Sequence, residues 1–391
     1  MGKLPDYIGV SAFGIKMGVI VPGSDVVSLV YDSLEKCKQD GLLHDGDTVC
    51  VTESIVARAQ NNYVTAQDIA REVTDKLKIN SRSKIGVLFP ILSRNRFAMI
   101  LKGIAGSVTE GKVVIQLSHP ADEVGNQVLH HDFAESIGKC DADVITLDEI
   151  GSDRFRHPIT KVDYVELYRE IVAEQGCETE IIFSNDPVKI AEYDLDGIIV
   201  ANIHQRERTF RKIKAAGQNC ITLQQLCNSG QAWSEWGVLG SNISSGDKLK
   251  LAPRHADEVA GKIQAKVKAG LGINAEVIIY GDGAYRDPST GIYELADPQP
   301  AFGMTKGLAG KYRQGLKYKY MVDVLFDEGI DIDEIENSIE AKKGESFADD
   351  CFETEGTTPR KAEDLMASLA DLISGSADAG TPLVLVKGFL A

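Results

Sequence analysis

The chain has 391 residues, 43% hydrophobic and 26% charged, a balance typical of a globular protein with room for two or three domains. Its formal net charge of −16 argues against nucleic acid as a partner, because such a surface repels phosphate backbones. No apolar run approaches the roughly 20 residues that cross a bilayer, and the opening residues lack a signal-peptide pattern. The seven cysteines are scattered without a C-x-x-C pair, so we expect a cytoplasmic protein without membrane contact.

Residues 1–118 alternate helix and strand signals. Apolar residues recur at helical spacing in Asp25–Gln39, and Thr48–Thr52 is a short apolar run typical of a buried strand. Thr65–Leu77 is predicted as a helix capped by its first residue. A strand at Lys84–Phe89 precedes a helix at Arg96–Ile104, whose basic residues we expect on its solvent face.

Composition shifts near His119, and we interpret residues 119–225 as an inserted α/β subdomain. Its apolar strands are separated by amphipathic helices, which favours a small parallel sheet. The strands are expected at Val144–Leu147, Glu180–Phe183, Gly197–Ala201 and Cys220–Leu223, and the helices at Val162–Glu174 and His204–Ala216.

Residues 226–391 return to mixed structure. Ile330–Gly356 is strongly acidic and is interpreted as a surface excursion. The other elements are a helix at His255–Ala269, a strand at Ala275–Tyr280, a helix at Thr358–Gly375 and a strand at Leu383–Val386.

The segment Val277–Pro288 is the strongest chemical signal. An apolar strand ends in a glycine-flanked acid, Asp282, which is followed by Arg286 and Asp287. Two neighbouring carboxylates can hold a divalent ion, and an arginine can bind a phosphate or carboxylate at two points. The alternative is a tight surface turn, where Gly and Asp are common for backbone reasons.

A second candidate is the strand-to-helix passage at Thr52, Glu53 and Ser54, with Arg58 one turn further. A helix start offers N–H groups to an anion, and Glu53 could bind a metal; the alternative is ordinary helix capping. A third segment, Ser241–Asp247, carries small polar residues that could line a phosphate pocket or belong to any exposed loop. The nearby Lys248 and Lys250 alternate along a strand and are interpreted as a solvated edge.

Taken together and in this order, these segments resemble the coenzyme F-420 γ-glutamyl ligase family. The resemblance rests on four blocks that cover about half of the chain. They are Val19–Val27, Asp45–Ala59, the pair Gly240–Ala256 and Val277–Pro288, and the closing Thr358–Gly388.

The resemblance implies an amide-forming ligase that joins a substrate carboxylate to L-glutamate through an acyl phosphate. It implies GTP as co-substrate, with ATP as the alternative, and Mg²⁺ or Mn²⁺, with K⁺ as a further candidate. It also implies an α+β fold, with a mixed-sheet core made of residues 1–118 and 226–391 and interrupted by the α/β insert. The implied assembly is a homodimer whose small-molecule partners are the nucleotide, L-glutamate and a carboxylate-bearing acceptor. The site residues that it implies are Asp282, Arg286 and Arg58 for catalysis, Thr52, Ser54, Ser241, Asn242, Thr358 and Asp364 for the nucleotide, and Asp282, Asp287 and Glu53 for metal.

The chain departs from the family pattern at several of these positions. A metal-binding aspartate of the family falls at Leu239, a histidine near Gly230, and the threonine after the catalytic aspartate at Gly283. The two lysines of the strand–helix block are Ser54 and Arg58, and Asn61-Asn62 replaces a Gly-Arg pair. The replacement for the lost carboxylate is either Glu235 or Glu53.

Two explanations of these departures stay open: a rebuilt metal site with a different substrate, or binding without turnover. A non-catalytic nucleotide-binding protein and a metal-dependent phosphotransferase or hydrolase are therefore the rival functions. The ligase prediction requires the tip of Ala275–Tyr280, the stretch Thr52–Arg58 and the closing helix to share one charged cavity.

Overall fold

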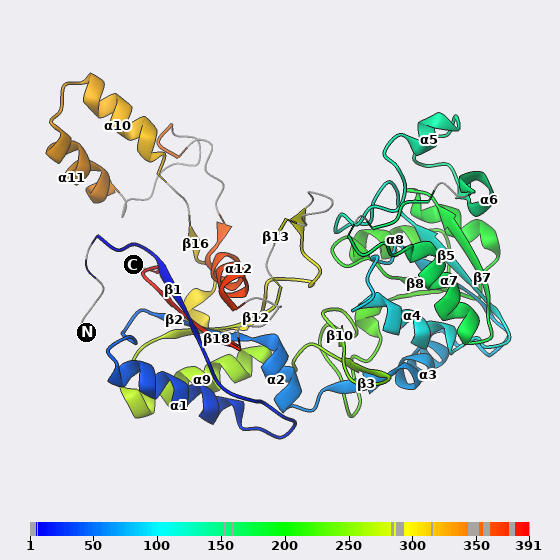
Figure 1. Ribbon diagram of the computed structural model, residues 1–391, viewed down its shortest axis with the longest axis horizontal. Helices are drawn as coiled ribbons and strands as arrows, with labels where there is room; N and C mark the ends of the chain where they lie inside the picture. The colour runs from blue at the N-terminus through cyan, green and yellow to red at the C-terminus, as the bar shows by residue number, and fades with distance from the viewer. Residues whose placement is uncertain are drawn as a thin grey trace.

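The computed structural model describes residues 5, 7–151, 154–157, 159–282, 285–286, 293–313, 316–342, 352–354, 360–374 and 380–390, with only the backbone at 285–286, 293–294 and 313. The chain forms a core around a five-stranded sheet and an α/β unit around a six-stranded sheet, with a three-stranded sheet between them (Figure 1). Helices accompany both parallel and antiparallel strands, which confirms the predicted α+β class.

The core sheet is mixed. Its strands in spatial order are β1 (Ser11–Ile15), β18 (Leu383–Lys387), β2 (Thr48–Thr52), β12 (Glu276–Tyr280) and β15 (Ala301–Met304). β2 and β12 run parallel, and the other neighbours run antiparallel. The parallel pair places the ends of β2 and β12 side by side, so Thr52 lies opposite Tyr280 in the register.

Helices cover both faces of this sheet. On one face lie α1 (Val26–Gln39), α2 (Glu53–Ala59) and α9 (Ala256–Leu271), and on the other lie α12 (Ala362–Ser374) and the 3-10 helix η3 (Lys306–Leu308). Side chains of a strand alternate between faces, so Val49 and Val51 pack toward α1 and α9 while Cys50 packs toward α12. This two-sided burial explains why β2 is apolar throughout.

The α/β unit is a nearly parallel sheet. Its strands in spatial order are β6 (Ile145–Thr146), β7 (Glu178–Phe183), β5 (Lys112–Leu117), β4 (Lys84–Leu88), β8 (Gly197–Val200) and β9 (Cys220–Thr222). All neighbours are parallel except β6, which pairs antiparallel with β7. The parallel sheet predicted from the apolar strands is confirmed.

Helices cover both faces of this second sheet as well. On one face lie α3 (Ala66–Leu77), α4 (Phe97–Ala105) and α7 (Tyr164–Glu174), and on the other lie α8 (Arg206–Ala215) and η1 (Pro187–Tyr193). Three short helices complete the unit: α5 (Phe133–Ser136), α6 (Leu147–Ile150) and η2 (Leu223–Gln225). The sheet is therefore wound on both sides, and the chain leaves β4 toward α4 but leaves β8 toward α8.

The sheet divides the chain differently from the predicted boundaries. β4 and β5 precede residue 119, yet they pair with β8 and β7, so the predicted division between 118 and 119 runs through one sheet. The composition shift at His119 marks the loop that follows β5 and not the start of a folding unit. The lower boundary lies instead near α3, because this helix packs into the core of the α/β unit.

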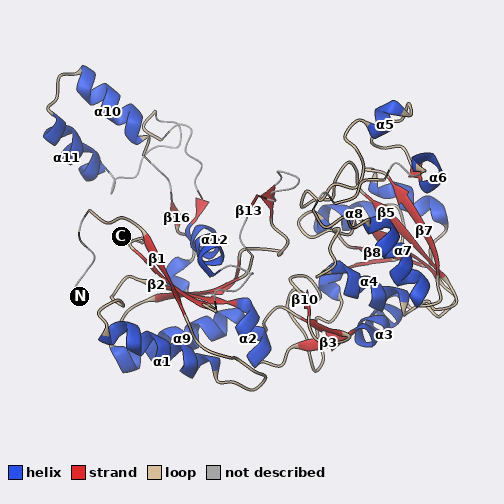
Figure 2. Ribbon diagram, in the orientation of Figure 1, coloured by secondary structure: helices blue, strands red, loops and turns tan. Residues whose placement is uncertain are grey.

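The two parts meet at a small antiparallel sheet of β10 (Asn242–Ile243), β11 (Lys248–Lys250) and β3 (Tyr63–Thr65). Figure 2 shows these strands between the core and the α/β unit. The described residues also include two short antiparallel strand pairs, β13 (Tyr285–Arg286) with β14 (Tyr293–Glu294) and β16 (Tyr312–Arg313) with β17 (Arg360–Lys361). None of the described helices has the length and apolar character needed to cross a membrane.

Part of the acidic segment is helical. α11 (Ile332–Lys342) packs Ile335 and Ile339 against Met321 of α10 (Tyr318–Asp327). The predicted surface excursion at Ile330–Gly356 therefore contains an ordered helix, because its isoleucines recur at helical spacing. The pair of helices projects from the rest of the molecule (Figure 1).

Candidate active site

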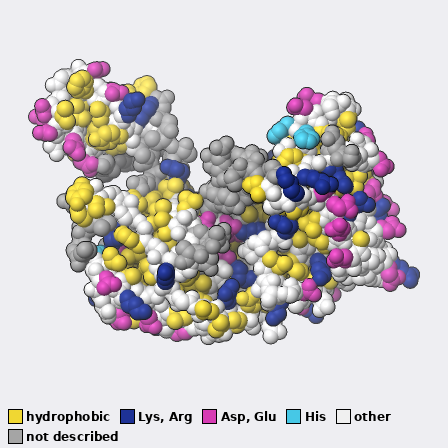
Figure 3. Space-filling model, viewed as in Figure 1, with side chains coloured by type: hydrophobic (Ala, Val, Ile, Leu, Met, Phe, Trp, Pro, Cys, Tyr) yellow, Lys and Arg dark blue, Asp and Glu magenta, His cyan; other side chains and the backbone are white. Residues whose placement is uncertain are grey.

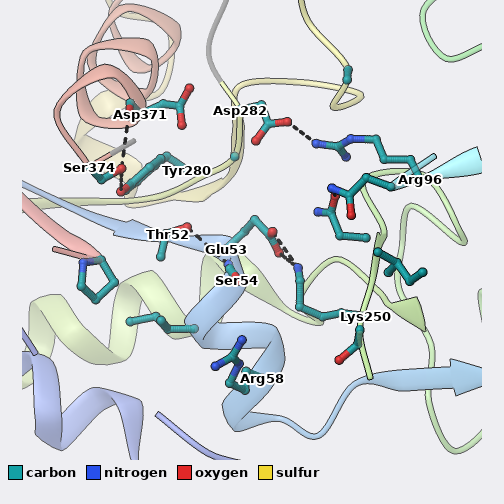
Figure 4. Close-up of a pocket in the computed structure, with 18 of the residues that line it drawn as sticks. Thr52, Glu53, Ser54, Arg58, Arg96, Lys250, Tyr280, Asp282, Asp371 and Ser374 are labelled. Atoms are coloured by element: carbon teal, nitrogen blue, oxygen red, sulfur yellow. Dashed lines mark hydrogen bonds and ion pairs between the residues drawn. The ribbon is translucent and has the colours of Figure 1, made fainter. Parts of the chain in front are cut away.

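A cavity of about 740 Å³ lies where the core meets the α/β unit. We call it the main cavity. Its walls come from the end of β2 and the start of α2, the loop after β4, the three-stranded sheet, the end of β12 and the last turns of α12. The three stretches that the ligase prediction required thus share one pocket: Thr52–Arg58, the tip of β12 and the closing helix (Figure 4).

The most buried charges of this cavity form one ion pair. Lys250 Nζ lies 2.7 Å from both carboxylate oxygens of Glu53, and the two side chains are only 8% and 7% exposed. The predicted solvated edge is therefore wrong for Lys250, because β11 is the central strand of its sheet and turns this residue toward α2. Lys248, two residues earlier, is exposed.

A second ion cluster lies across the cavity. Arg96 Nη1 lies 2.6 Å from an Asp297 oxygen, and its Nη2 contacts Asp282 (Figure 4). The backbone N–H of Asp282 donates to Asp297 at 2.7 Å. The guanidinium therefore bridges two carboxylates, and Arg96 is buried, contrary to the solvent-facing position predicted for it. It precedes α4 and does not lie on the outer face of that helix.

These contacts set the protonation of the acids. Burial raises the pKa of Asp282 to about 7, with a further contribution from the Asp297 carboxylate, while Arg96 acts in the opposite direction. Burial also raises the pKa of Glu53, against the attraction of Lys250. Burial alone would lower the pKa of Arg96, but Asp297 and Asp282 outweigh it and keep the guanidinium charged.

The closing helix enters the cavity through its last turns. Asp371 and Ser374 line the wall, and the Tyr280 hydroxyl donates to Ser374 Oγ at 2.7 Å. The predicted residue Asp364 lies about two turns earlier on α12, or about 10 Å along its axis, and is not among the lining residues. Burial raises the pKa of Asp364 as well.

With this geometry established, comparison with known protein families identifies the chain. The sequence model of the F420-0:Gamma-glutamyl ligase family matches residues 14–388. The chain belongs to this family. The match spans nearly the whole chain and runs through the α/β unit. No curated protein sequence matches the chain.

The family's candidate residues divide into three groups. Thr52, Ser54, Glu53, Arg58, Asn242 and Asp282 line the main cavity. Ser241 does not, because it is buried behind the wall and donates its hydroxyl to the Val238 carbonyl at 2.6 Å. Asp287, Thr358 and Gly283 lie outside the described residues, and only the backbone of Arg286 is described, in β13.

The start of α2 shows capping. The Thr52 side chain accepts a hydrogen bond from the Ser54 N–H at 3.5 Å. This is the ordinary helix capping that the sequence offered as the alternative to an anion site. Arg58 lies in the last turn of the same helix, lines the cavity and remains exposed. The Arg58 guanidinium is therefore the group of this segment that we expect to bind an anion.

The departures from the family pattern have structural counterparts. Leu239 is buried in the hydrophobic core of the α/β unit. Asn62 is fully buried and donates to the Trp233 and Ala252 carbonyls at 2.8 Å, so it ties the three-stranded sheet to neighbouring loops. Of the two candidate replacements for the lost carboxylate, Glu53 lines the main cavity, whereas Glu235 accepts from the His255 N–H outside it.

Sequence reasoning missed several residues of this ligase-family cavity, above all Arg96, Lys250 and Asp371. Asp297 also escaped notice. The one available signal was the position of Arg96 shortly after a predicted strand, because loops at strand ends of α/β sheets carry functional side chains. Nothing in the spacing of Lys250 or Asp371 points to the cavity.

Proposed function

We propose that the protein is a nucleotide- and divalent-metal-dependent ligase that joins a substrate carboxylate to L-glutamate through an acyl phosphate. Membership of the γ-glutamyl ligase family supplies the reaction class. The observation that carries the finer proposal is the main cavity, which gathers Arg58, Arg96 and Lys250 beside Glu53 and Asp282. Three cationic side chains in one pocket can bind the anionic reactants, which are a nucleoside triphosphate, a substrate carboxylate and L-glutamate.

The arrangement of the cations favours different tasks. Lys250 and Arg96 are held by buried carboxylates, which neutralise their charge but fix the direction of their N–H groups. Arg58 is exposed in the same cavity and can make the two-point contact with a phosphate or carboxylate that guanidinium geometry allows. We assign it to the terminal phosphate or to the substrate carboxylate.

We expect a divalent cation to enter this cavity together with the nucleotide. Among the described residues, no group of three or more His, Cys, Asp or Glu is arranged to hold a metal. Mg²⁺, however, needs only one or two carboxylates when phosphates supply other ligands. We assign the cation to Asp282, whose pKa is raised by burial and by Asp297 and would be lowered by a bound cation. The metal would offset charge on the transferred phosphate.

The proposed reaction has two steps. An oxygen of the substrate carboxylate forms a bond to the γ-phosphorus, and the bond from that phosphorus to the β-phosphate oxygen breaks, releasing the nucleoside diphosphate. The glutamate nitrogen then bonds to the acyl carbon, and inorganic phosphate leaves. The proton lost by the amine passes to a carboxylate of the cavity or to water. Fixed N–H donors of Lys250 and Arg96 favour both phosphate-bearing states.

Measuring nucleoside diphosphate release tests this function. A ligase releases GDP or ADP only when both L-glutamate and a carboxylate acceptor such as F420-0 are present, with Mn²⁺ or Mg²⁺. Release without acceptor or glutamate would identify a hydrolase, and nucleotide binding with no release under any condition would identify a binding protein. Parallel GTP and ATP reactions decide the nucleotide.

A further inference from the structure

A second cavity, of about 250 Å³, lies within the α/β unit at the carboxyl ends of its parallel strands. Its lining includes Phe89 after β4, Ser118 after β5, Asn185 after β7 and Asn202 after β8. Arg208 and Lys212 of α8 complete one wall. We call it the switch-point cavity. None of the residues proposed for the ligase reaction lines it.

Its position follows from the winding of the sheet. β4 and β8 are adjacent, but the chain leaves β4 for α4 on one face and leaves β8 for α8 on the other. Connections that diverge in this way leave a crevice beyond the two strand ends, because no helix can close it from either side. Ligands of open α/β sheets bind in such crevices. Phe89 and Asn202 stand at the two strand ends concerned.

A buried polar atom in this cavity is left without a partner. Asn202 is 5% exposed, and its side-chain nitrogen donates to Thr209 Oγ1 at 3.1 Å. Its side-chain oxygen has no hydrogen bond among the described residues. A buried acceptor left unpaired is unfavourable, because it has lost its hydrogen bond to water without gaining another. A ligand that brings an O–H or N–H donor to Asn202 would remove this cost.

The charged residues around the cavity indicate the rest of the ligand. Arg208 and Lys212 lie four residues apart on α8, are exposed, and have no acidic partner among the described side chains. Figure 3 shows Lys and Arg side chains gathered over the α8 region. Glu123 already accepts from the His204 and Gln205 N–H groups at 3.2 Å, so the helix start is occupied by a protein carboxylate. An anion would therefore bind to the two side chains.

The other lining acid does not oppose an anion strongly. The Asp122 carboxylate already accepts three backbone hydrogen bonds. The donors are the N–H groups of Leu92 at 2.7 Å, Val124 at 3.1 Å and Asn126 at 2.8 Å. This same loop separates the two cavities, because Val124 and Asn126 line the main cavity while Asp122 lines the switch-point cavity. A ligand in the second cavity would thus contact the back of a main-cavity wall.

We propose that the switch-point cavity binds a small organic phosphate monoester that carries hydroxyl or amino donors, in the size range from a sugar phosphate to a nucleoside monophosphate. Arg208 and Lys212 bind the phosphate, whose charge of about −2 calls for two cations. Asn202 accepts from the donor on the organic part. The volume is below the roughly 300–1,000 Å³ of sites for larger ligands, which excludes a dinucleotide.

Isothermal titration calorimetry with AMP and ribose 5-phosphate tests the proposal. It is run in EDTA, so that metal-dependent binding in the main cavity is suppressed, and at about 0.15 M salt to screen diffuse charge. Wild-type protein is expected to bind at least one ester saturably, at one site per chain, and more tightly than adenosine or inorganic phosphate. No saturable binding of either ester, or equal affinity for inorganic phosphate, would overturn the proposal.

Two double variants on one helix locate the site. Arg208→Ala/Lys212→Ala removes the two lining cations, and Arg211→Ala/Lys214→Ala removes the same charge from α8 outside the cavity. The first is expected to weaken ester binding at least tenfold, and the second less than twofold. Equal losses in both variants would mean that the helix attracts anions by its overall charge, which would also overturn the proposal.

Discussion

The main cavity and the switch-point cavity are both polar, but their charges are balanced differently. In the main cavity, Lys250 and Arg96 are 8% and 11% exposed at the side chain, and each contacts a carboxylate that the fold brings to it. In the switch-point cavity, Arg208 and Lys212 are exposed and form no ion pair among the described residues, although Asp122 and Glu123 line the same cavity.

This difference separates two ways of preparing a site for an anion. Buried pairs fix the direction of the charged groups before a ligand arrives. The desolvation free energy of these groups is then part of folding and not of binding. Exposed cations stay hydrated and mobile, so they attract anions without defining a geometry. The first arrangement suits transition-state stabilisation, and the second suits reversible binding. Four predictions test this contrast.

The largest expected effect is on folding. Lys250→Ala leaves the buried Glu53 carboxylate unpaired, so we expect a loss of about 3–5 kcal/mol in the free energy of unfolding. Urea denaturation measures it. Lys248→Ala, on the same strand β11 but exposed, and Lys212→Ala in the other cavity should each change stability by less than about 0.5 kcal/mol. A loss below about 1 kcal/mol for Lys250→Ala would contradict the buried pair.

The next effect is on nucleotide binding. Asp282→Ala removes the carboxylate best placed for a cation, so affinity for the nucleotide in the presence of Mn²⁺ should fall at least about 100-fold, or about 3 kcal/mol. A fluorescence titration with and without metal measures this change. The matched control is Asp323→Ala, which removes an exposed carboxylate from α10. Unchanged affinity in Asp282→Ala would remove this residue from the site.

A pH-dependent effect of intermediate size is expected from the same carboxyl group. Because the folded-state pKa of Asp282 is raised to about 7 from 3.8, its contribution to stability is full below pH 3.8 and is lost as pH rises through about 7. Asp282→Asn does not titrate. The shift alone implies about 3 kcal/mol between about pH 4.5 and 8. Because the Asp282 side chain is 32% exposed, solvent screening reduces this value, and the variant should gain about 1–2 kcal/mol relative to wild type.

The pH experiment has its own control. Unfolding free energies at both pH values are measured for Asp32→Asn, which changes an exposed carboxylate of α1. Its difference from wild type should not vary with pH. If Asp282→Asn behaves in the same way, Arg96 rather than burial governs the ionisation of Asp282.

The smallest effect concerns the exposed cation of the main cavity. Arg58→Ala should raise the KM for nucleotide or acceptor about five- to tenfold, or about 1 kcal/mol, and leave the unfolding free energy within about 0.5 kcal/mol. Steady-state kinetics and denaturation measure both quantities. Arg71→Ala, an exposed arginine of α3, is the control. A change in stability without a change in KM would assign Arg58 to the fold.

Local sequence signals predicted the elements around the site well. The helix after Asp25 begins at Val26 with that aspartate as its cap, and Thr65 forms a capping box with Asp68. In each cap the two interacting residues lie within about one helical turn, so both are recognisable in one short stretch of sequence. The strand that ends near Asp282 was also predicted from a local pattern, the apolar run Ala275–Tyr280.

The boundary of the α/β unit and the burial of Lys250 were harder to predict from the sequence. β4 and β5 look like strands of any sheet, and their partners β8 and β7 follow much later in the chain. Lys250 occupies an alternating strand pattern that is common at exposed edges. Its burial depends on β11 being flanked by β3 and β10, which no local pattern encodes.

The sequence by itself determined the type of many elements around the site, the family, and the position of Asp282 at the end of a buried strand. Only the tertiary structure decided which charges neutralise one another: Lys250 meets Glu53 across 197 positions, and Arg96 meets Asp282 across 186. The reason is physical. A helix or strand follows from neighbours a few positions apart, whereas a buried charge needs an opposite charge nearby in space, and chain folding can bring that charge from any distance in sequence.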